Sequence, residues 1–199
     1  MSYKSVNKVA GVSGVLSPVL AFVLIGLAIS RASWFTWTDN ALSDLGVHEE
    51  SALLFNSGLI LSGILTVIFA FGVMRFYGTK SVGRSGTFFL LLAGIFLAAI
   101  GVFPETAPNN IHYIVSVAFF GALPLSLFIQ SAALMTSTAS RSFGVFTLVM
   151  AIVALSPWAI WTAFKPYSGV AIPELISAVA AALWSITMGT KLIRQAEFS

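Results

Sequence analysis

The chain has 199 residues, of which 58% are hydrophobic and only 9% are charged, and its mean hydropathy is +0.96. Because soluble domains carry about 25% charged residues, this composition excludes a soluble fold and predicts an integral membrane protein. The formal net charge is +3, and the absence of cysteine excludes disulfides, iron–sulfur clusters and zinc–thiolate sites.

Apolar segments recur along the whole chain, separated by short polar or proline-rich turns. A helix needs about 20 mostly apolar residues to cross a hydrocarbon core about 30 Å thick. The first segment follows Lys4 and Lys8 as a secretory signal would, but it is longer than a signal core, so we expect a retained span. The sequence therefore predicts an all-α, single-domain bundle of six transmembrane helices at about 9–29, 52–77, 86–103, 111–135, 143–163 and 170–193.

The basic residues predict the orientation of this bundle. Lysine and arginine in short loops favour the cytoplasmic side of a membrane. With six spans, only Arg31 and Lys165 fall on the side opposite the termini, and the other eight share one side: Lys4, Lys8, Arg75, Lys80, Arg84, Arg141, Lys191 and Arg194. We therefore expect a multi-pass protein of the cell (plasma) membrane with both termini in the cytoplasm. Anionic lipid headgroups account for the basic charge, so no nucleic-acid partner is expected.

Most other titratable side chains gather on the predicted outer side. They come from the first outer loop, the second outer loop and the start of the fourth span. Lys165 and Glu174 would come from the third outer connection. The candidate ligand-binding residues are Asp39, Asn40, Ser43, Asp44, His48, Glu105 and His112.

The first outer loop is the most informative segment, because it has about 20 residues and long loops are often functional. Ser43 and Asp44 precede Leu45-Gly46, a pattern that predicts a tight turn in which a side chain caps backbone amides. We expect four apolar residues to hold the loop on the membrane surface: Trp34, Trp37, Leu42 and Leu45. Two interpretations stay open, an interfacial segment that satisfies its own backbone and a ligand or catalytic role for Asp39 or Asp44.

The remaining candidates carry no specific signature. His112, at the start of the fourth span, would either hydrogen-bond to the first loop or act on a ligand, metal or proton. Glu174 follows Pro173 in the first turn of the sixth span, where the helix dipole favours a carboxylate. Ser43, Asp44 and His112 could form a hydrolytic triad, but no nucleophile motif accompanies them, so they are weak catalytic candidates. The histidine and carboxylate spacing indicates no metal site, and no cofactor is expected.

Short motifs place the chain near a known family. They are NALSDLG at 40–46, FNSG at 55–58, GVFP at 101–104, His112, and FFG at 119–121. This pattern resembles the DUF998 family of bacterial and archaeal membrane proteins and, more distantly, the Frag1/DRAM/Sfk1 group, which shares a serine-aspartate-x-glycine loop and a histidine opening the fourth span. The resemblance implies a six-helix fold with its N-terminus inside. It draws attention to Ser43, Asp44, Gly46, Pro104 and His112.

Three functions remain as hypotheses. The first is a non-catalytic lipid-interacting or scaffold protein, which includes an accessory subunit of a larger membrane complex. Its partners would be membrane lipids or other membrane-protein subunits. The second is an enzyme that acts on lipids at the outer leaflet with Asp44 and His112 as acid and base, which predicts a cavity where the first loop meets the fourth span. The third is a small transporter or channel. The eukaryotic relatives are tied to lipid remodelling and trafficking, so a lipid role is the natural extrapolation by fold analogy.

Overall fold

Six long α-helices account for most of the computed structural model, which describes residues 3–198 and contains no strand in that range. Each is long and apolar enough to cross a membrane, so the predicted six-helix membrane fold is confirmed. The helices are α1 (Tyr3–Arg31), α2 (Glu49–Tyr77), α3 (Ser81–Val102), α4 (Ile111–Met135), α5 (Arg141–Phe164) and α6 (Ala171–Phe198). Three short 3₁₀ helices lie in the connections: η1 (Leu42–Gly46), η2 (Pro108–Asn110) and η3 (Thr138–Ser140).

The helices extend beyond several of the apolar segments that predicted them. α1 begins at Tyr3 rather than near residue 9, and α3 begins at Ser81 rather than near residue 86. Hydropathy marks only the part of a helix that crosses hydrocarbon, whereas polar residues can continue the same helix through the headgroup region. The additional turns therefore carry much of the basic charge.

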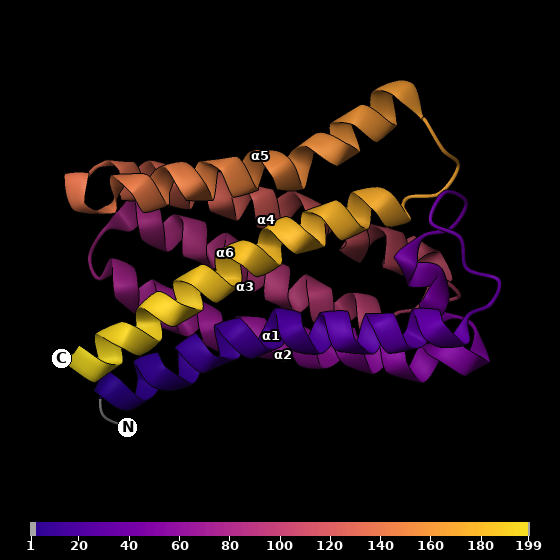
Figure 1. The fold of residues 1–199 in the computed structure, drawn as a ribbon, viewed down its shortest axis with the longest axis horizontal. Helices are drawn as coiled ribbons and strands as arrows, with labels where there is room; N and C mark the ends of the chain where they lie inside the picture. Colours follow the sequence, from indigo (N-terminus) through magenta and orange to yellow (C-terminus); the bar gives the residue numbers. More distant parts are fainter. Residues whose placement is uncertain (1–2, 199) are drawn as a thin grey trace.

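The six helices form a closed ring in sequence order. Each packs against the next along the chain, and α6 returns to α1 (Figure 1). The contact between α5 and α6 is the least extensive in the ring, and α5 bends away from α6 toward the end that carries the first loop. Pro157 lies inside α5, and a proline removes a backbone hydrogen bond and kinks a helix. The ring of helices is therefore least tightly packed between α5 and α6.

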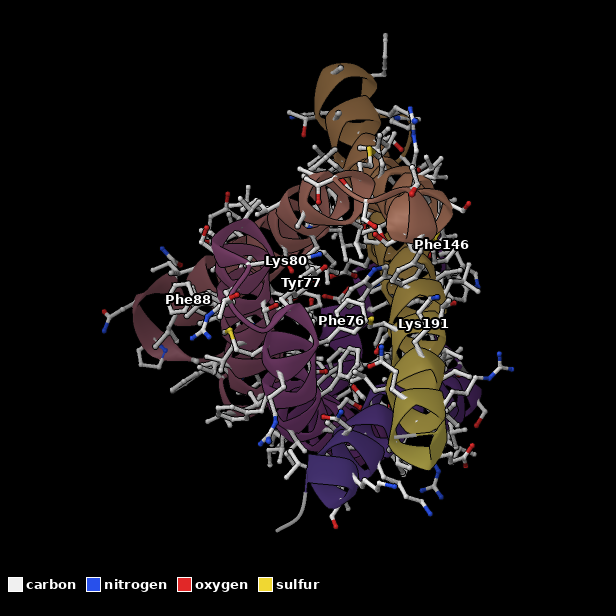
Figure 2. All side chains as sticks on the ribbon, turned by 90° about the vertical axis from the view of Figure 1, so that its left-hand side faces the viewer. Phe76, Tyr77, Lys80, Phe88, Phe146 and Lys191 are labelled. Atoms are coloured by element: carbon white, nitrogen blue, oxygen red, sulfur yellow. The ribbon has the colours of Figure 1, made fainter. Side chains whose placement is uncertain are left out.

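The two ends of the bundle differ in character. Both termini lie at one end, which we call the terminal face, and the first loop lies at the other, which we call the loop face (Figure 1). Figure 2 views the terminal face, where Tyr77 points into the bundle and is 4% exposed, while Phe88 points outward. Lys191 Nζ lies 4.8 Å from the centroid of the Phe143 ring, a cation–π contact at this basic end.

Glycines allow the ring to close. Cβ atoms built on Gly11 of α1 and Gly189 of α6 would each lie 2.6 Å from the carbonyl oxygen of the other glycine. In lipid, helices associate by close packing of small residues rather than by the hydrophobic effect. The contact between the first and last helices therefore depends on the absence of side chains here.

We expect Gly11→Leu to destabilise the bundle by about 1–3 kcal/mol, because the added side chain would meet the backbone of α6. The measurement is the melting temperature of the purified protein in mild detergent. Gly26→Leu on the same helix is the matched control, since a Cβ at Gly26 has no atom within 4 Å. Equal melting temperatures for the two variants would contradict the close α1–α6 contact.

Candidate functional site

The first loop (residues 32–48) inserts into the bundle instead of lying on the membrane surface. Leu42 is 6% exposed and Leu45 is fully buried, and both pack with Phe55 and Ile100 in one core cluster. The expectation that these two leucines hold the loop on the membrane surface is therefore wrong. In a 3₁₀ helix, side chains three residues apart point the same way, so η1 directs both leucines inward.

Asp44 holds the turn that was predicted around it. One carboxylate oxygen, Oδ2, accepts hydrogen bonds from the backbone amide of Ala41 at 3.0 Å and from Asn40 Nδ2 at 2.9 Å. The Asn56 amide of α2 donates to the Gly46 carbonyl at 2.9 Å and fixes the other end of η1. These bonds give Asp44 a clear structural role, because a side chain that caps a free backbone amide stabilises the first turn of a helix.

Asp39 joins the first loop to the connection between α5 and α6. Its carboxylate accepts hydrogen bonds from the hydroxyls of Thr36 at 2.8 Å, Ser168 at 2.9 Å and Thr38 at 3.0 Å. These bonds, that of Thr36 first, favour the ionised form and lower the pKa of Asp39 below its ordinary value. The backbone amide of Gly169 also donates to the Thr38 carbonyl at 2.7 Å. A side chain at Gly169 would collide with the backbone of Asn40, so the two loops approach as closely as glycine permits.

His48 lies apart from the other candidate residues. Its ring stacks on Trp34 with 3.9 Å between centroids, and Trp34 Nε1 donates to Glu50 Oε1 at 2.7 Å. His48 precedes α2 in an extended conformation and is exposed. Its contacts therefore stabilise the start of α2, and His48 lines neither cavity described below.

A second polar group brings together three of the predicted residues. Ser43 Oγ donates to Glu105 Oε1 at 2.7 Å, and His112 Nε2 lies 3.8 Å from the same oxygen. His112 Nδ1 lies 2.7 Å from the Phe103 carbonyl, which can only accept, so we assign the ring proton to Nδ1. In the neutral ring Nε2 is then an acceptor, and Ser116 Oγ lies 3.4 Å from it.

Glu174 completes this group from α6. Its Oε2 accepts a hydrogen bond from the backbone amide of Leu42 at 2.6 Å, and the residue is only 8% exposed. The sequence placed Glu174 at the positive end of the helix dipole, and the structure adds a direct bond to the first loop. The other carboxylate oxygen, Oε1, has no hydrogen-bond partner among residues 3–198.

These polar residues line a cavity of about 610 Å³, which we call the mouth cavity, at the loop face between α4, α5 and α6. This volume is within the range of small-molecule sites. Ser43 enters from the first loop, His112 and Ser116 from α4, and Trp158 and Trp161 from α5. Its lining includes the last part of α5 and the start of α6.

A second, smaller cavity of about 130 Å³, which we call the inner cavity, continues into the bundle. Apolar side chains dominate its lining, among them Phe22, Leu59, Leu97, Leu123, Ala178 and Ala181. The two cavities share four lining residues: Ser43, Ser116, Phe120 and Glu174. They therefore adjoin, with the polar groups at the mouth and an apolar interior behind them.

The structure separates the predicted site residues into two groups. Ser43, Glu105 and His112 line the mouth cavity, whereas Asp39, Asn40, Asp44 and His48 line neither cavity. The hydrolytic triad of Ser43, Asp44 and His112 that the sequence allows does not form. The Ser43 hydroxyl donates to Glu105, and Asp44 caps its own loop. Sequence reasoning missed Trp158 and Trp161 as cavity residues, since both also fit an interfacial aromatic belt. Residues 3–198 contain no cluster of three metal-ligating side chains.

The chain matches one protein family over most of its length. The family described as "Protein of unknown function (DUF998)" matches residues 15–191, so the chain belongs to that family. Comparisons with curated proteins and with solved structures find no match. The function must therefore be argued from the site itself.

The cap assigned to Asp44 predicts different effects for two substitutions. Asp44→Ala removes the acceptor for the Ala41 amide, which we expect to cost about 1 kcal/mol. Hydrogen–deuterium exchange at residues 36–48 should then accelerate about fivefold. Asp44→Asn keeps an acceptor oxygen and should leave exchange close to that of the unmodified protein. Equal acceleration in both variants would show that the negative charge, rather than the cap, orders the loop.

Proposed function

We propose that this protein binds a membrane lipid without transforming it, with the headgroup in the mouth cavity and part of an acyl chain in the inner cavity. The observation that carries the proposal is the pair of adjoining cavities, one with polar groups and the other apolar. A lipid has the same division, with a polar head joined to an apolar chain. Sites for small molecules are typically concave and mostly apolar, with a few placed polar groups.

The surroundings of the mouth cavity support entry from the bilayer. Val117 of α4 is 54% exposed and Leu155 of α5 is 43% exposed, and both line the cavity. Exposed apolar residues at a cavity rim between two spanning helices face lipid rather than water. Tyr113, which is 70% exposed at the same rim, suits the headgroup level. A lipid could therefore enter sideways between α4 and α5.

The distribution of basic residues supports the orientation that we propose. The bounds of the helices put eight of the ten lysines and arginines near the terminal face, and Arg31 and Lys165 at the loop face. Positive charge favours the cytoplasm, so the mouth cavity would open at the outer leaflet of the cell membrane. The protein would then act as a non-catalytic lipid carrier or lipid-dependent scaffold, alone or as an accessory subunit.

A second candidate function is chemistry on the bound lipid, and one observation favours it. His112 Nδ1 is held by the Phe103 carbonyl, which leaves Nε2 able to accept a proton inside the mouth cavity. Incubation of the purified protein with phospholipids, followed by lipid mass spectrometry, tests this function. Accumulation of a product that disappears in His112→Gln would establish it, and unchanged lipids would leave binding alone.

We expect Ala178→Phe to block retention of lipid, because its side chain would occupy the inner cavity. If the new side chain excludes only two CH₂ groups of the acyl chain from the inner cavity, at about 0.8 kcal/mol each, the affinity for the lipid would fall about tenfold. The measurement is native mass spectrometry of the protein released from mild detergent, with the fraction of lipid-bound molecules as the readout.

The matched control is Val179→Phe, on the neighbouring residue of α6, which is 41% exposed and lines neither cavity. It should retain lipid as the unmodified protein does. Equal lipid occupancy in the two variants, with both folded, would show that any retained lipid lies outside the inner cavity.

A further inference from the structure

We infer that the headgroup bound in the mouth cavity carries a positively charged ammonium group, as in phosphatidylethanolamine, rather than a purely anionic group. This inference rests on the proposed function, since it names the class of lipid for the same site. It is carried by the charges, the hydrogen-bonding groups and the aromatic rings that line the cavity.

The mouth cavity is lined by carboxyl groups that face no lysine or arginine. Glu105 and Glu174 contribute two carboxyl groups, and no lysine or arginine is among the described residues that line it. Sites that take a phosphate or carboxylate headgroup use arginine, lysine or clustered backbone amides. A purely anionic headgroup would therefore find no basic side chain here, whereas an ammonium group would find two carboxyl groups.

Glu174 gives this argument its strongest support. The residue is buried, it forms no ion pair with a lysine or arginine of residues 3–198, and its Oε1 has no hydrogen-bond partner there. Buried charges in proteins are normally paired, because removal from water is costly for an isolated charge. Glu174 borders both cavities, so an ammonium group in the mouth cavity would supply the missing partner.

Three side-chain hydrogen-bond donors at this site are already engaged. Trp158 Nε1 donates to Ser177 Oγ at 2.9 Å, Trp161 Nε1 donates to the Tyr167 carbonyl at 3.2 Å, and Ser43 donates to Glu105. The backbone amides of Val170 and Ala171 at the start of α6 donate to the Asn40 carbonyl. These groups offer no free donor to an anion, whereas an ammonium group donates to the carboxyl oxygens that remain.

The aromatic rings favour the same headgroup. Trp158 and Trp161 line the cavity, and both indole N–H groups bond elsewhere, so the two residues offer their aromatic rings rather than a free donor. Cations are attracted to the faces of aromatic rings, most strongly to tryptophan. Carboxyl oxygens and indole rings together therefore form a surface suited to an ammonium group.

The experiment is a competition between two lipids with identical acyl chains, palmitoyl-oleoyl phosphatidylethanolamine and palmitoyl-oleoyl phosphatidylglycerol. The full-length protein is reconstituted with equal amounts of both, and the retained lipid is measured by native mass spectrometry. We expect phosphatidylethanolamine to be retained about tenfold over phosphatidylglycerol, a difference of about 1.4 kcal/mol. Glu174→Gln and Glu105→Gln should each reduce that ratio.

Glu49→Gln is the control variant, since Glu49 is an exposed carboxyl at the loop face that lines neither cavity. It should keep the full ratio. The Glu174→Gln side chain keeps an oxygen for the Leu42 amide, and Glu105→Gln, away from that bond, provides a second test should Glu174→Gln misfold.

The outcomes separate the two proposals. Retained lipid with no preference, or with a preference for phosphatidylglycerol, would overturn the ammonium inference and leave lipid binding intact. A preference that survives both glutamate substitutions would also overturn it. Retention of neither lipid by the unmodified protein would overturn the proposed function and this inference together.

Discussion

The hydrogen bond from the Leu42 amide to Glu174 is the contact on which the loop face depends. It joins residues 132 positions apart and connects the first loop directly to the start of α6. By holding η1 in the bundle, it places Ser43 next to Glu105, which in turn lies beside His112. A hydrogen bond shielded from water is electrostatically stronger than one exposed to it. Together with the core packing of Leu42 and Leu45, this bond holds the first loop against the mouth cavity.

The same residue links stability and function. A carboxyl group that is buried without a cation is costly, and a chain optimised only for stability would replace it. Natural proteins break such local rules mainly at functional sites, where the cost is balanced elsewhere. Here the compensation comes from the Leu42 bond and from the core packing of Leu42 and Leu45 against Phe55. A buried carboxyl group that has no cationic partner and borders a cavity therefore supports the proposal of a bound ligand.

Local signals made the helices predictable, and non-local contacts made the site harder to predict. Six apolar segments decide the fold because only helices satisfy their backbone in lipid. The turn at Asp44 was also predictable, since its cap involves residues three and four positions away. The burial of Leu42 and Leu45 was not, because an apolar residue in a membrane loop can face either lipid or the bundle. Glu174 was assigned to a helix dipole, since no sequence pattern reveals a partner in the first loop.

The polar group does not form the predicted arrangement of acid, base and hydroxyl. Asp44, the predicted acid, is committed to its own loop, and Ser43 donates a hydrogen bond to Glu105 rather than to His112. His112 Nε2 lies 3.8 Å from that carboxylate and 3.4 Å from the Ser116 hydroxyl. Both distances are longer than the 2.7 Å bond between Ser43 and Glu105. A nucleophile needs a base within hydrogen-bond reach and a third group to orient that base. Here the Phe103 carbonyl orients His112, but the Ser43 hydroxyl bonds to Glu105 and not to His112. These residues are fixed hydrogen-bond acceptors at the mouth cavity, as the proposed recognition of an ammonium group requires.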